Sequence, residues 1–370
     1  MKILHLLSGG GLGGIEILCR DIAHNSKQEN EFVFLFSGGK ITDELEREGQ
    51  HIYRLYLKKG RIRRIGYLMR LVRIQQYDVI IAHHGTLSIF LYYLFLQAVF
   101  PEKIYIKYLH SVFDERFYYK NNWFHDRLIC WSLNRIFRVS DHIVAVSEYV
   151  KVSFAKRFPC NSERIAVIYN GIPIKKYNLL KQQERGHGRT LLYIGRLEKE
   201  KGLAILLKAA GIMEKDGLYS FRIIIVGSGS YTEVLERVIA EERLEERVIL
   251  EKETLDKDKY YGLADIFLYP SVCREAFGIS IVEAMQQGLL CVASDTGGIP
   301  ELINHQTNGF LFRTGNARSL VNCLYGIFNM DQETKNAVCM QAAVTAQGFS
   351  IENTIEQLEK LYEKWGEVSE

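Results

Sequence analysis

Residues 266–285 read IFLYPSVCREAFGISIVEAM, and this stretch decides how the second half of the chain folds. The apolar run 266–269 predicts a buried strand. The pattern at 279–287 predicts a helix that starts near Gly278 and ends at Gly288. A strand that leads through a short loop into a helix is the repeating unit of parallel, doubly wound sheets.

Two glutamates, Glu275 and Glu283, stand eight positions apart around the predicted helix start. The first N–H groups of a helix have no intrahelical partner, and the helix dipole favours an anion there. Glu275 precedes this end, whereas Glu283 lies about a turn and a half inside the helix. A bound phosphate would therefore have a carboxylate on each side, each able to accept from hydroxyls. This layout suits a nucleoside diphosphate sugar, which carries hydroxyls on both flanks of a double anion.

Length and composition predict a globular protein of two domains. A chain of 370 residues is too long for one ordinary core, and 47% hydrophobic with 25% charged residues is typical of soluble proteins. The seven cysteines are scattered and form no Cys-x-x-Cys pair, which favours reduced cytoplasmic thiols over a disulfide or zinc framework. The strand-like segment 2–7 stands first, so we expect no signal peptide. The longest apolar run, 87–100, is too short for a bilayer and predicts a buried helix.

Charge is distributed unevenly, although the net charge is only +3. Residues 1–170 hold 24 Lys and Arg against 16 Asp and Glu, whereas residues 171–370 hold 23 against 28. Eight of the ten histidines also fall in the first half. This difference is consistent with two domains that bind separate ligands.

The first half alternates apolar strands with helical patterns, which predicts a parallel, doubly wound sheet. Helical patterns stand at 15–25 and 118–139, turn residues at 170–173 close the series, and the polar stretch 175–189 is the expected linker. Strands are predicted at 2–7, 32–36, 51–55, 79–82, 104–109, 142–146 and 165–169.

A second series of the same kind follows, with its clearest helix at 233–243 and an amphipathic helix at 351–365. Strands are predicted at 190–194, 221–226, 248–251, 266–269, 290–293 and 309–312. We therefore predict an α/β protein with two Rossmann-like domains, 1–174 and 190–350, that face each other across a cleft. Ligands of such sheets bind outside the carboxyl ends of the strands, so the cleft is the expected active site.

Several loops after predicted strands are candidates for ligand contact. Gly13 and Gly14, in the glycine-rich loop 9–16, would let the backbone approach a ligand closely, and a tight strand-to-helix turn is the alternative. Gly227 begins another glycine turn that either lines a donor pocket or is a plain turn.

The loop 195–202 offers Arg196 and Lys201 beside glycines. Two cations at the carboxyl end of a strand can neutralise a diphosphate. The alternative is a solvated loop in which Glu198 and Glu200 pair locally. The predicted phosphate site around Glu275 and Glu283 favours phosphate binding as the role of the loop 195–202.

Histidines end two predicted strands of the first half. His110 follows 104–109, and His83 and His84 follow 79–82. Near-neutral titration and two ring nitrogens suit His110 to a polar contact with a sugar or an acceptor, whereas a structural role is the alternative. Metal ligation is not expected, because no clustered carboxylates or Asp-x-Asp motif accompany a glycine loop here.

Residues 58–73 hold seven basic residues, no acidic one, and apolar residues at helical spacing. A basic amphipathic helix can lie on anionic lipid, whereas an ordinary surface helix is the alternative. The aromatic run 117–124 either extends this surface or shapes an acceptor pocket. Nucleic-acid binding is not expected, since the basic patch is confined to one short stretch.

In this order the segments resemble the retaining glycosyltransferases of the GT-B architecture, specifically family 4, over nearly the whole chain. The departure is at 248–252, where that family has an aromatic residue followed by glycine. The matching segments are Gly13–Glu16, His110, Asp141–Glu148, Asn170–Gly171, Gly195–Gly202 and Glu275–Glu283, the last of which is the family's Glu-x7-Glu motif.

The resemblance implies specific roles. Arg196 and Lys201 would hold the donor diphosphate, and Glu283 would accept from the ribose. Glu275 and His110 would contact the donor sugar at the reacting centre. Backbone N–H groups of Ala276, Phe277, Gly278 and Ile279 would assist at the phosphates, and Gly13 and Gly14 would approach them from the first domain. Residues 351–370 would pack back on the first domain.

The implied reaction transfers a hexose or N-acetylhexosamine, with retention, from a nucleoside diphosphate sugar (UDP favoured) to a glycan or lipid-linked acceptor. The expected setting is bacterial cell-envelope polysaccharide synthesis. Neither a metal nor another cofactor is expected, because cations and helix dipoles can stabilise the leaving diphosphate. We expect a cytoplasmic protein, peripheral on the membrane if 58–73 binds lipid.

Three alternatives remain open from the sequence. A nucleotide-sugar epimerase would consume donor without an acceptor, and a phosphorylase with pyridoxal phosphate would show the cofactor's visible absorbance. A non-catalytic subunit would bind nucleotide sugar without turning it over, although the intact glutamates and cations argue against it.

Overall fold

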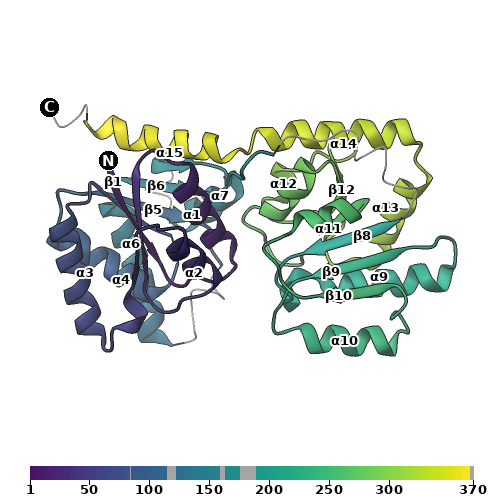
Figure 1. Ribbon diagram of the computed structural model, residues 1–370, viewed down its shortest axis with the longest axis horizontal. Coiled ribbons are helices and arrows are strands. Elements are labelled where there is room, and N and C mark those ends of the chain that lie inside the picture. The colour runs from purple at the N-terminus through teal and green to yellow at the C-terminus, as the bar shows by residue number, and fades with distance from the viewer. Residues whose placement is uncertain (84, 115–121, 159–162, 176–188, 367–370) are drawn as a thin grey trace. The chain divides into compact units, whose positions relative to one another are not determined.

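The computed structural model describes residues 1–83, 85–114, 122–158, 163–175 and 189–366. The chain forms two compact units (Figure 1). The first unit comprises Met1–Pro173 and Ser350–Glu370, and the second comprises Ile174–Phe349.

A seven-stranded parallel sheet is the centre of the first unit, in the order β3-β2-β1-β4-β5-β6-β7. The order reverses between β1 and β4, so this pair is the topological switch point at which open α/β sheets bind ligands. The strands are β1 (Lys2–Leu7), β2 (Glu29–Phe34), β3 (Ile52–Arg54), β4 (Val79–Ala82), β5 (Ile104–Leu109), β6 (His142–Ala145) and β7 (Ile165–Val167).

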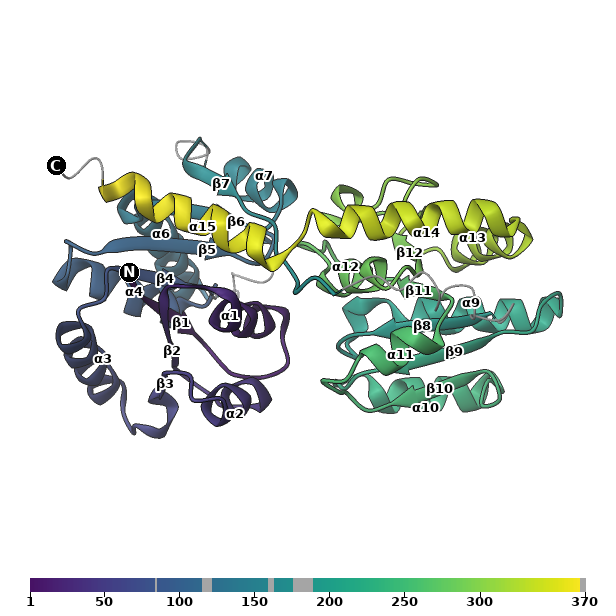
Figure 2. The same cartoon turned by 45° about the horizontal axis from the view of Figure 1, so that its top comes forward.

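Helices flank the sheet of the first unit (Figure 2). They are α1 (Gly14–Asn25), α2 (Lys40–Arg47), α3 (Arg61–Gln75), α4 (Leu87–Val99), α6 (Trp123–Val139), α7 (Glu148–Arg157) and α15 (Ile351–Gly366), with the 3₁₀ turn η1 (Leu55–Leu57). The last helix, α15, belongs to this unit although it follows the second unit in sequence. It contacts α1, and Thr354 Oγ1 donates to the Tyr169 carbonyl at 2.8 Å.

The second unit has a six-stranded parallel sheet in the order β10-β9-β8-β11-β12-β13, and its switch point lies between β8 and β11. The strands are β8 (Thr190–Ile194), β9 (Arg222–Val226), β10 (Val248–Glu251), β11 (Ile266–Tyr269), β12 (Leu290–Ser294) and β13 (Phe310–Phe312). The helices are α9 (Leu203–Asp216), α10 (Thr232–Glu241), α11 (Asp258–Leu263), α12 (Ile279–Gln286), α13 (Ala317–Asn329) and α14 (Gln332–Gln347), with the 3₁₀ turns η3 (Lys199–Lys201) and η4 (Ile299–Glu301).

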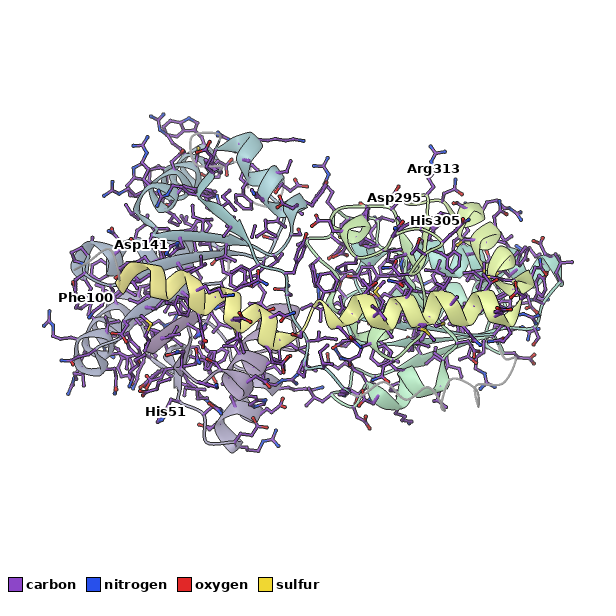
Figure 3. All side chains as sticks on the ribbon, turned by 90° about the horizontal axis from the view of Figure 1, so that it is seen from above. His51, Phe100, Asp141, Asp295, His305 and Arg313 are labelled. Carbon is purple, nitrogen blue, oxygen red and sulfur yellow. The ribbon has the colours of Figure 1, made fainter. Side chains whose placement is uncertain are left out.

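Apolar side chains fill the space between sheet and helices in each unit (Figure 3). In the second unit α12 lies against α14, β11 and β12, and α13 lies against α9. This packing fixes the position at which α12 begins, beside the end of β11.

The predicted fold class is confirmed, and most predicted strands agree with the structure to within two residues at each end. The largest difference is β2, which begins at Glu29 rather than at residue 32. The first residues of β2 are polar, so the apolar pattern of the sequence did not reveal them. Asn30 and Glu31 are nevertheless buried, and their side chains form hydrogen bonds. The predicted helix 118–139 begins at Trp123 in the structure, and residues 115–121 lie outside the described ones.

Among the described residues, no helix combines the length and the apolar character needed to span a bilayer. The apolar segment 87–100 forms α4 instead, and Ile89, Phe90 and Tyr93 on this helix are buried in the first unit. The segment is therefore a helix as predicted, but it is only partly buried, since Leu91, Phe95 and Val99 are exposed.

Candidate functional site

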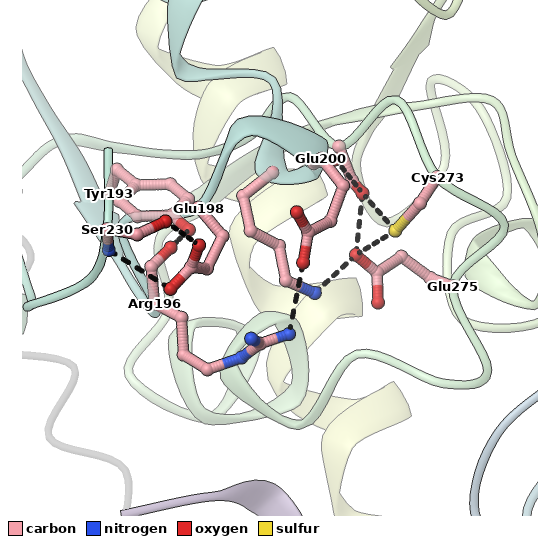
Figure 4. A network of polar contacts seen from close by, with 9 residues as sticks. Tyr193, Arg196, Glu198, Glu200, Ser230, Cys273 and Glu275 are labelled. Atoms are coloured by element: carbon pink, nitrogen blue, oxygen red, sulfur yellow. Dashed lines mark hydrogen bonds and ion pairs between the residues drawn. The ribbon is translucent and has the colours of Figure 1, made fainter. Parts of the chain in front are cut away.

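Two loops at the switch point of the second unit bring Lys201 and Glu275 together. Lys201 ends η3 after β8, and Glu275 lies between β11 and α12. Lys201 Nζ donates to Glu275 Oε1 at 2.7 Å (Figure 4). Ser271 Oγ and Cys273 Sγ reach the same oxygen at 2.6 and 3.4 Å. Three donors therefore fix this carboxylate in place.

Glycines let these loops approach each other. Gly202 has φ +72°, and a Cβ there would collide with the carbonyl of Pro270. Gly297 has φ +63°, and a Cβ there would collide with the backbone of Glu275, to whose carbonyl Gly298 N donates at 2.8 Å. A side chain at either position would collide with this backbone and displace the loop that carries Glu275. L-residues also rarely adopt these dihedral angles, so both positions favour glycine.

The Lys201–Glu275 pair is buried and remains charged. Burial opposes the charge of each group, yet their mutual attraction outweighs it, so the pKa of Glu275 is lowered and that of Lys201 is raised. The two shifts agree in sign with an ion pair. A lysine ammonium has three donors and a carboxylate accepts about four hydrogen bonds, so each group retains capacity for a ligand.

The N-terminus of α12 follows Glu275 closely in the chain. Gly278 is the N-cap residue, with φ +142°, and offers no side-chain oxygen to the first N–H groups of the helix. The amides of Ile279 and Ser280 therefore lack an intrahelical acceptor. Together with Lys201, they make this end of the sheet attractive to an anion.

Glu283 lies one and a half turns into α12 and is held by two side chains from the start of α11. Lys257 Nζ lies 2.8 and 2.9 Å from its two oxygens, and Tyr261 OH donates to Oε2 at 2.8 Å. Burial, followed by the nearby Glu283 carboxylate, raises the pKa of the Tyr261 hydroxyl, so Tyr261 is a donor at neutral pH. Glu283 is therefore a pre-oriented acceptor.

Arg196 and Gly227 occupy the loops beside β8. The Arg196 guanidinium is more than half exposed and lies 3.5 Å from Glu200 Oε1, whereas Lys201 is nearly buried. Glu198 pairs with Ser230 rather than with a cation (Figure 4). A Cβ at Gly227 would collide with the carbonyl of Gly195, so close backbone packing alone explains a glycine at this position. A ligand contact of Gly227 stays a prediction.

The remaining predicted residues lie in the first unit. Gly13 is the N-cap of α1 and Gly14 its first residue, directly after β1. His110 follows β5, and its Nε2 lies 2.9 Å from Nδ1 of His83. His84 lies outside the described residues.

Four side chains that form hydrogen bonds with Glu275, Glu283 or His83 were not predicted from the sequence. Lys257 and Tyr261 stand four positions apart at a helix start, but no local motif connects them to Glu283. Ser271 lies within the stretch that we singled out. His5 stands inside a strand, where its polar contact with His83 depends on strand order.

Family models match almost the entire chain. The model described as "Glycosyltransferase Family 4" matches residues 12–176, and the one described as "Glycosyl transferases group 1" matches residues 178–340. The first match covers β2 to β7 of the first sheet, and the second match covers all six strands of the second sheet. The chain belongs to the family 4 glycosyltransferases, and its fold is the GT-B fold.

Individual relatives carry related descriptions. The amylovoran biosynthesis glycosyltransferase AmsK of Erwinia amylovora is 31% identical over 212 residues, which are 55% of this chain and 52% of that protein. The chain thus aligns with about half of that relative. An uncharacterized glycosyltransferase of Haemophilus influenzae is 27% identical over 95% of this chain and 97% of its own length.

Solved structures share the fold. Anabaena Alr3699/HepE in complex with UDP has a TM-score of 0.82 at 23% identity, covering 98% of this chain and all of that protein. The same protein has been solved with UDP-glucose, at a TM-score of 0.82 and 23% identity, over the same shares of the two chains.

Proposed function

We propose that this glycosyltransferase transfers a hexose or N-acetylhexosamine, with retention of configuration, from a UDP-sugar to a glycan or lipid-linked acceptor. The observation that carries the proposal is the arrangement in the second unit: a buried Lys201–Glu275 pair and the open start of α12, with Glu283 one and a half turns on. HepE, which has the same fold, is known in complex with UDP-glucose.

The diphosphate binds at the start of α12. Lys201 keeps its bond to Glu275 and directs its other N–H groups to the phosphates, while Arg196 swings in from solvent. The backbone N–H groups from Ala276 to Ile279 supply further donors. These groups stabilise the charge that grows on the leaving diphosphate, so the proposed reaction uses neither a metal nor another cofactor.

The two glutamates bind hydroxyls on opposite sides of the diphosphate. Glu283, oriented by Lys257 and Tyr261, accepts from the ribose, and Glu275 accepts from the donor sugar. Glu275 is ionised and therefore unsuited to act as a general acid. A donor phosphate oxygen takes the proton of the acceptor hydroxyl.

The first unit supplies the acceptor side. Gly13 and Gly14 approach the diphosphate, and His110 contacts the donor sugar near the reacting carbon. The biological setting is bacterial cell-envelope polysaccharide synthesis, in keeping with the description of AmsK as an amylovoran biosynthesis enzyme.

Attachment to an anionic membrane is a second part of the proposal. In α3, Leu68, Leu71 and Val72 are buried, yet Ile62 is 86% exposed among the basic residues of this helix. The first unit exposes further aromatic and apolar residues on α4 and α6, which contact each other: Leu91, Phe95, Trp123, Phe124 and Trp131. Such a combination favours the interface of an anionic bilayer.

Vesicle sedimentation tests the membrane proposal. Replacing Arg61, Arg63 and Arg64 by Gln should reduce binding to vesicles with phosphatidylserine and leave UDP binding unchanged. Equal sedimentation of variant and wild type would contradict the membrane role.

A panel of nucleotide sugars tests the enzymatic proposal. We expect UDP-sugars to raise the melting temperature more than GDP- or ADP-sugars, because ligands stabilise the native state by mass action. Acceptor-dependent UDP release, with unchanged sugar identity in acceptor-free controls, separates a transferase from an epimerase. Binding without any UDP release would favour the non-catalytic alternative.

A further inference from the structure

A diagonal of polar side chains crosses the sheet of the first unit and ends at His110. Asn30 Oδ1 lies 2.9 Å from His5 Nε2, and His5 Nδ1 lies 2.9 Å from His83 Nε2. His83 Nδ1 then lies 2.9 Å from His110 Nε2. The three imidazoles also stack, with centroids 5.2 Å apart at each step.

The strand register produces this diagonal. Asn30 on β2 pairs with Ile3 of β1, and His5 is two residues further along β1. His5 pairs with Ile81 of β4, and His83 is two residues beyond it. Each step therefore moves one strand over and two residues forward. Residues two apart point to the same face, so all the side chains meet there.

The next step of the diagonal follows the same rule. Ile81 pairs with Ile106 of β5, so His83 stands opposite Tyr108 and His110 follows two residues later. The diagonal thus runs from the buried Asn30 to the carboxyl end of β5, across the switch point between β1 and β4.

Asn30 gives the diagonal a direction. Its Nδ2 donates at 2.9 Å to the carbonyl of Gln28, which can only accept, so Oδ1 is the atom that faces His5. His5 must therefore carry its hydrogen on Nε2 and, when neutral, accept at Nδ1. A neutral His83 must then donate from Nε2 and accept at Nδ1, so that His110 donates from Nε2.

We propose that Asn30, His5 and His83 are positioning residues that hold His110 as the neutral tautomer with hydrogen on Nε2. The lone pair at Nδ1 of His110 is then directed to accept from a donor-sugar hydroxyl. This last role rests on the proposed function, whereas the tautomer does not.

The surroundings keep His5 neutral. Burial lowers the pKa of His5 to about 4, against a smaller opposing effect of its bond to Asn30. His83 is also buried, with Cys19 Sγ 3.7 Å from its Nε2, and burial raises the pKa of that thiol. Tyr108, whose ring lies against both His83 and His110, has a raised pKa through burial.

Nitrogen-15 NMR of histidine-labelled full-length protein at pH 7.5 tests the tautomer without any ligand. Protonated and unprotonated ring nitrogens resonate at well-separated frequencies, so each tautomer can be assigned. We expect all three rings to carry hydrogen on Nε2. A hydrogen on Nδ1 of His110 would overturn the proposal.

Asn30→Leu removes the acceptor at the start of the diagonal while keeping the side-chain volume similar. We expect His5 and His110 to become mixtures of tautomers, and kcat/KM for UDP-glucose to fall about tenfold, the equivalent of one hydrogen bond to the sugar. Unchanged tautomers in this variant would overturn the directing role. Ser132→Ala, another buried polar change in the first unit, is the control and should change neither measurement.

His83→Phe is a second variant in case Asn30→Leu folds poorly, because it preserves the ring stack and interrupts the hydrogen bonds. It should decouple His110 from His5, so that His110 becomes a mixture while His5 keeps its Nε2 hydrogen. UDP binding, which uses the second unit, should remain within about twofold of wild type in each variant. Wild-type protein that binds no UDP would instead contradict the proposed function and leave the tautomer result standing.

The same NMR sample also tests whether these histidines bind a metal ion. His5, Cys19 and His83 offer ligand atoms within 4.8 Å of one another. If stoichiometric zinc were found in purified protein, and its removal by chelator shifted the His5 and His83 resonances, the hydrogen-bonded diagonal would be wrong. We expect no such shift.

Discussion

The carboxyl ends of the two sheets use different chemistry at the same topological position. In the first unit, hydrogen-bonded imidazoles stand at the switch point, whereas in the second unit two Lys–Glu pairs do so. Both arrangements are at least partly buried, and the second is built from charged groups. Charges are useful where a diphosphate must be bound and its departure stabilised, and neutral acceptors suffice for hydroxyls.

A single residue in each unit sharpens this contrast. Lys107 on β5 is fully buried, donates to the carbonyl of Ala82 at 2.9 Å, and lies over the ring of Phe90. Burial lowers its pKa to about 7. Lys201 has a carboxylate partner, and its pKa is raised despite burial. For Lys201, the carboxylate in contact therefore outweighs the effect of burial on the pKa.

Removing Lys201 should give the largest effect. Lys201→Ala leaves Glu275 as an uncompensated buried carboxylate, so we expect a loss of about 3 to 5 kcal/mol in the unfolding free energy of the second unit. Sugar transfer should fall by roughly a thousandfold. Urea unfolding and acceptor-dependent UDP release measure the two effects. Lys199→Ala, on the same turn, is the control and should retain both.

The pH dependence of this loss follows from the two shifts. The lowered pKa of Glu275 contributes stability that is present above its ordinary value of 4.5 and is lost as pH falls through the folded value. The raised pKa of Lys201 contributes stability that is present below 10.5 and is lost above the folded value. Wild type and Lys201→Ala should therefore differ most between these limits. A constant difference from pH 3 to pH 9 would contradict the buried pair.

Lys107 should behave in the opposite way. Because its folded pKa lies below the unfolded 10.5, the charged form destabilises the fold below about pH 7, and this penalty disappears as pH rises to 10.5. Lys107→Met should raise the unfolding free energy at pH 6 by about 3 kcal/mol and lose this advantage by pH 10. A variant less stable than wild type at pH 6 would show that burial does not dominate the pKa of Lys107.

Glu283→Gln should weaken nucleotide binding with little change in fold. The amide leaves Lys257 without its charged partner and presents a weaker acceptor to the ribose, so we expect the Kd for UDP to rise about thirtyfold, or about 2 kcal/mol. Glu236→Gln on the exposed face of α10 is the matched control. Equal loss of affinity for inorganic pyrophosphate would indicate that Glu283 acts on the phosphates instead.

Tyr261→Phe should give the smallest effect. It removes one hydrogen bond to Glu283 and keeps Lys257 in place, so UDP affinity should fall by about threefold to tenfold. Calorimetric titration with UDP measures it. A loss as large as that of Glu283→Gln would mean that Tyr261 contacts the ligand itself.

The alternation of strands and helices was readable from the sequence because apolar runs and glycine turns are local signals. The start of α12 and the positions of Lys201 and Glu275 at strand ends were readable for the same reason. The pairing of Glu283 with Lys257 was not, because it depends on how α11 packs beside α12. The histidine diagonal was only half visible: His83 and His110 end strands, but His5 joins them through the parallel register of β1 and β4.

Calorimetric titration of UDP into wild-type protein with a metal chelator present tests the central claim most directly. We predict saturable one-to-one binding that is weakened at least tenfold by Lys201→Ala and by Glu283→Gln, in variants whose second unit remains folded. Wild-type affinity in both folded variants, or no UDP binding by the wild type, would contradict the assignment of the nucleotide to this end of the second sheet.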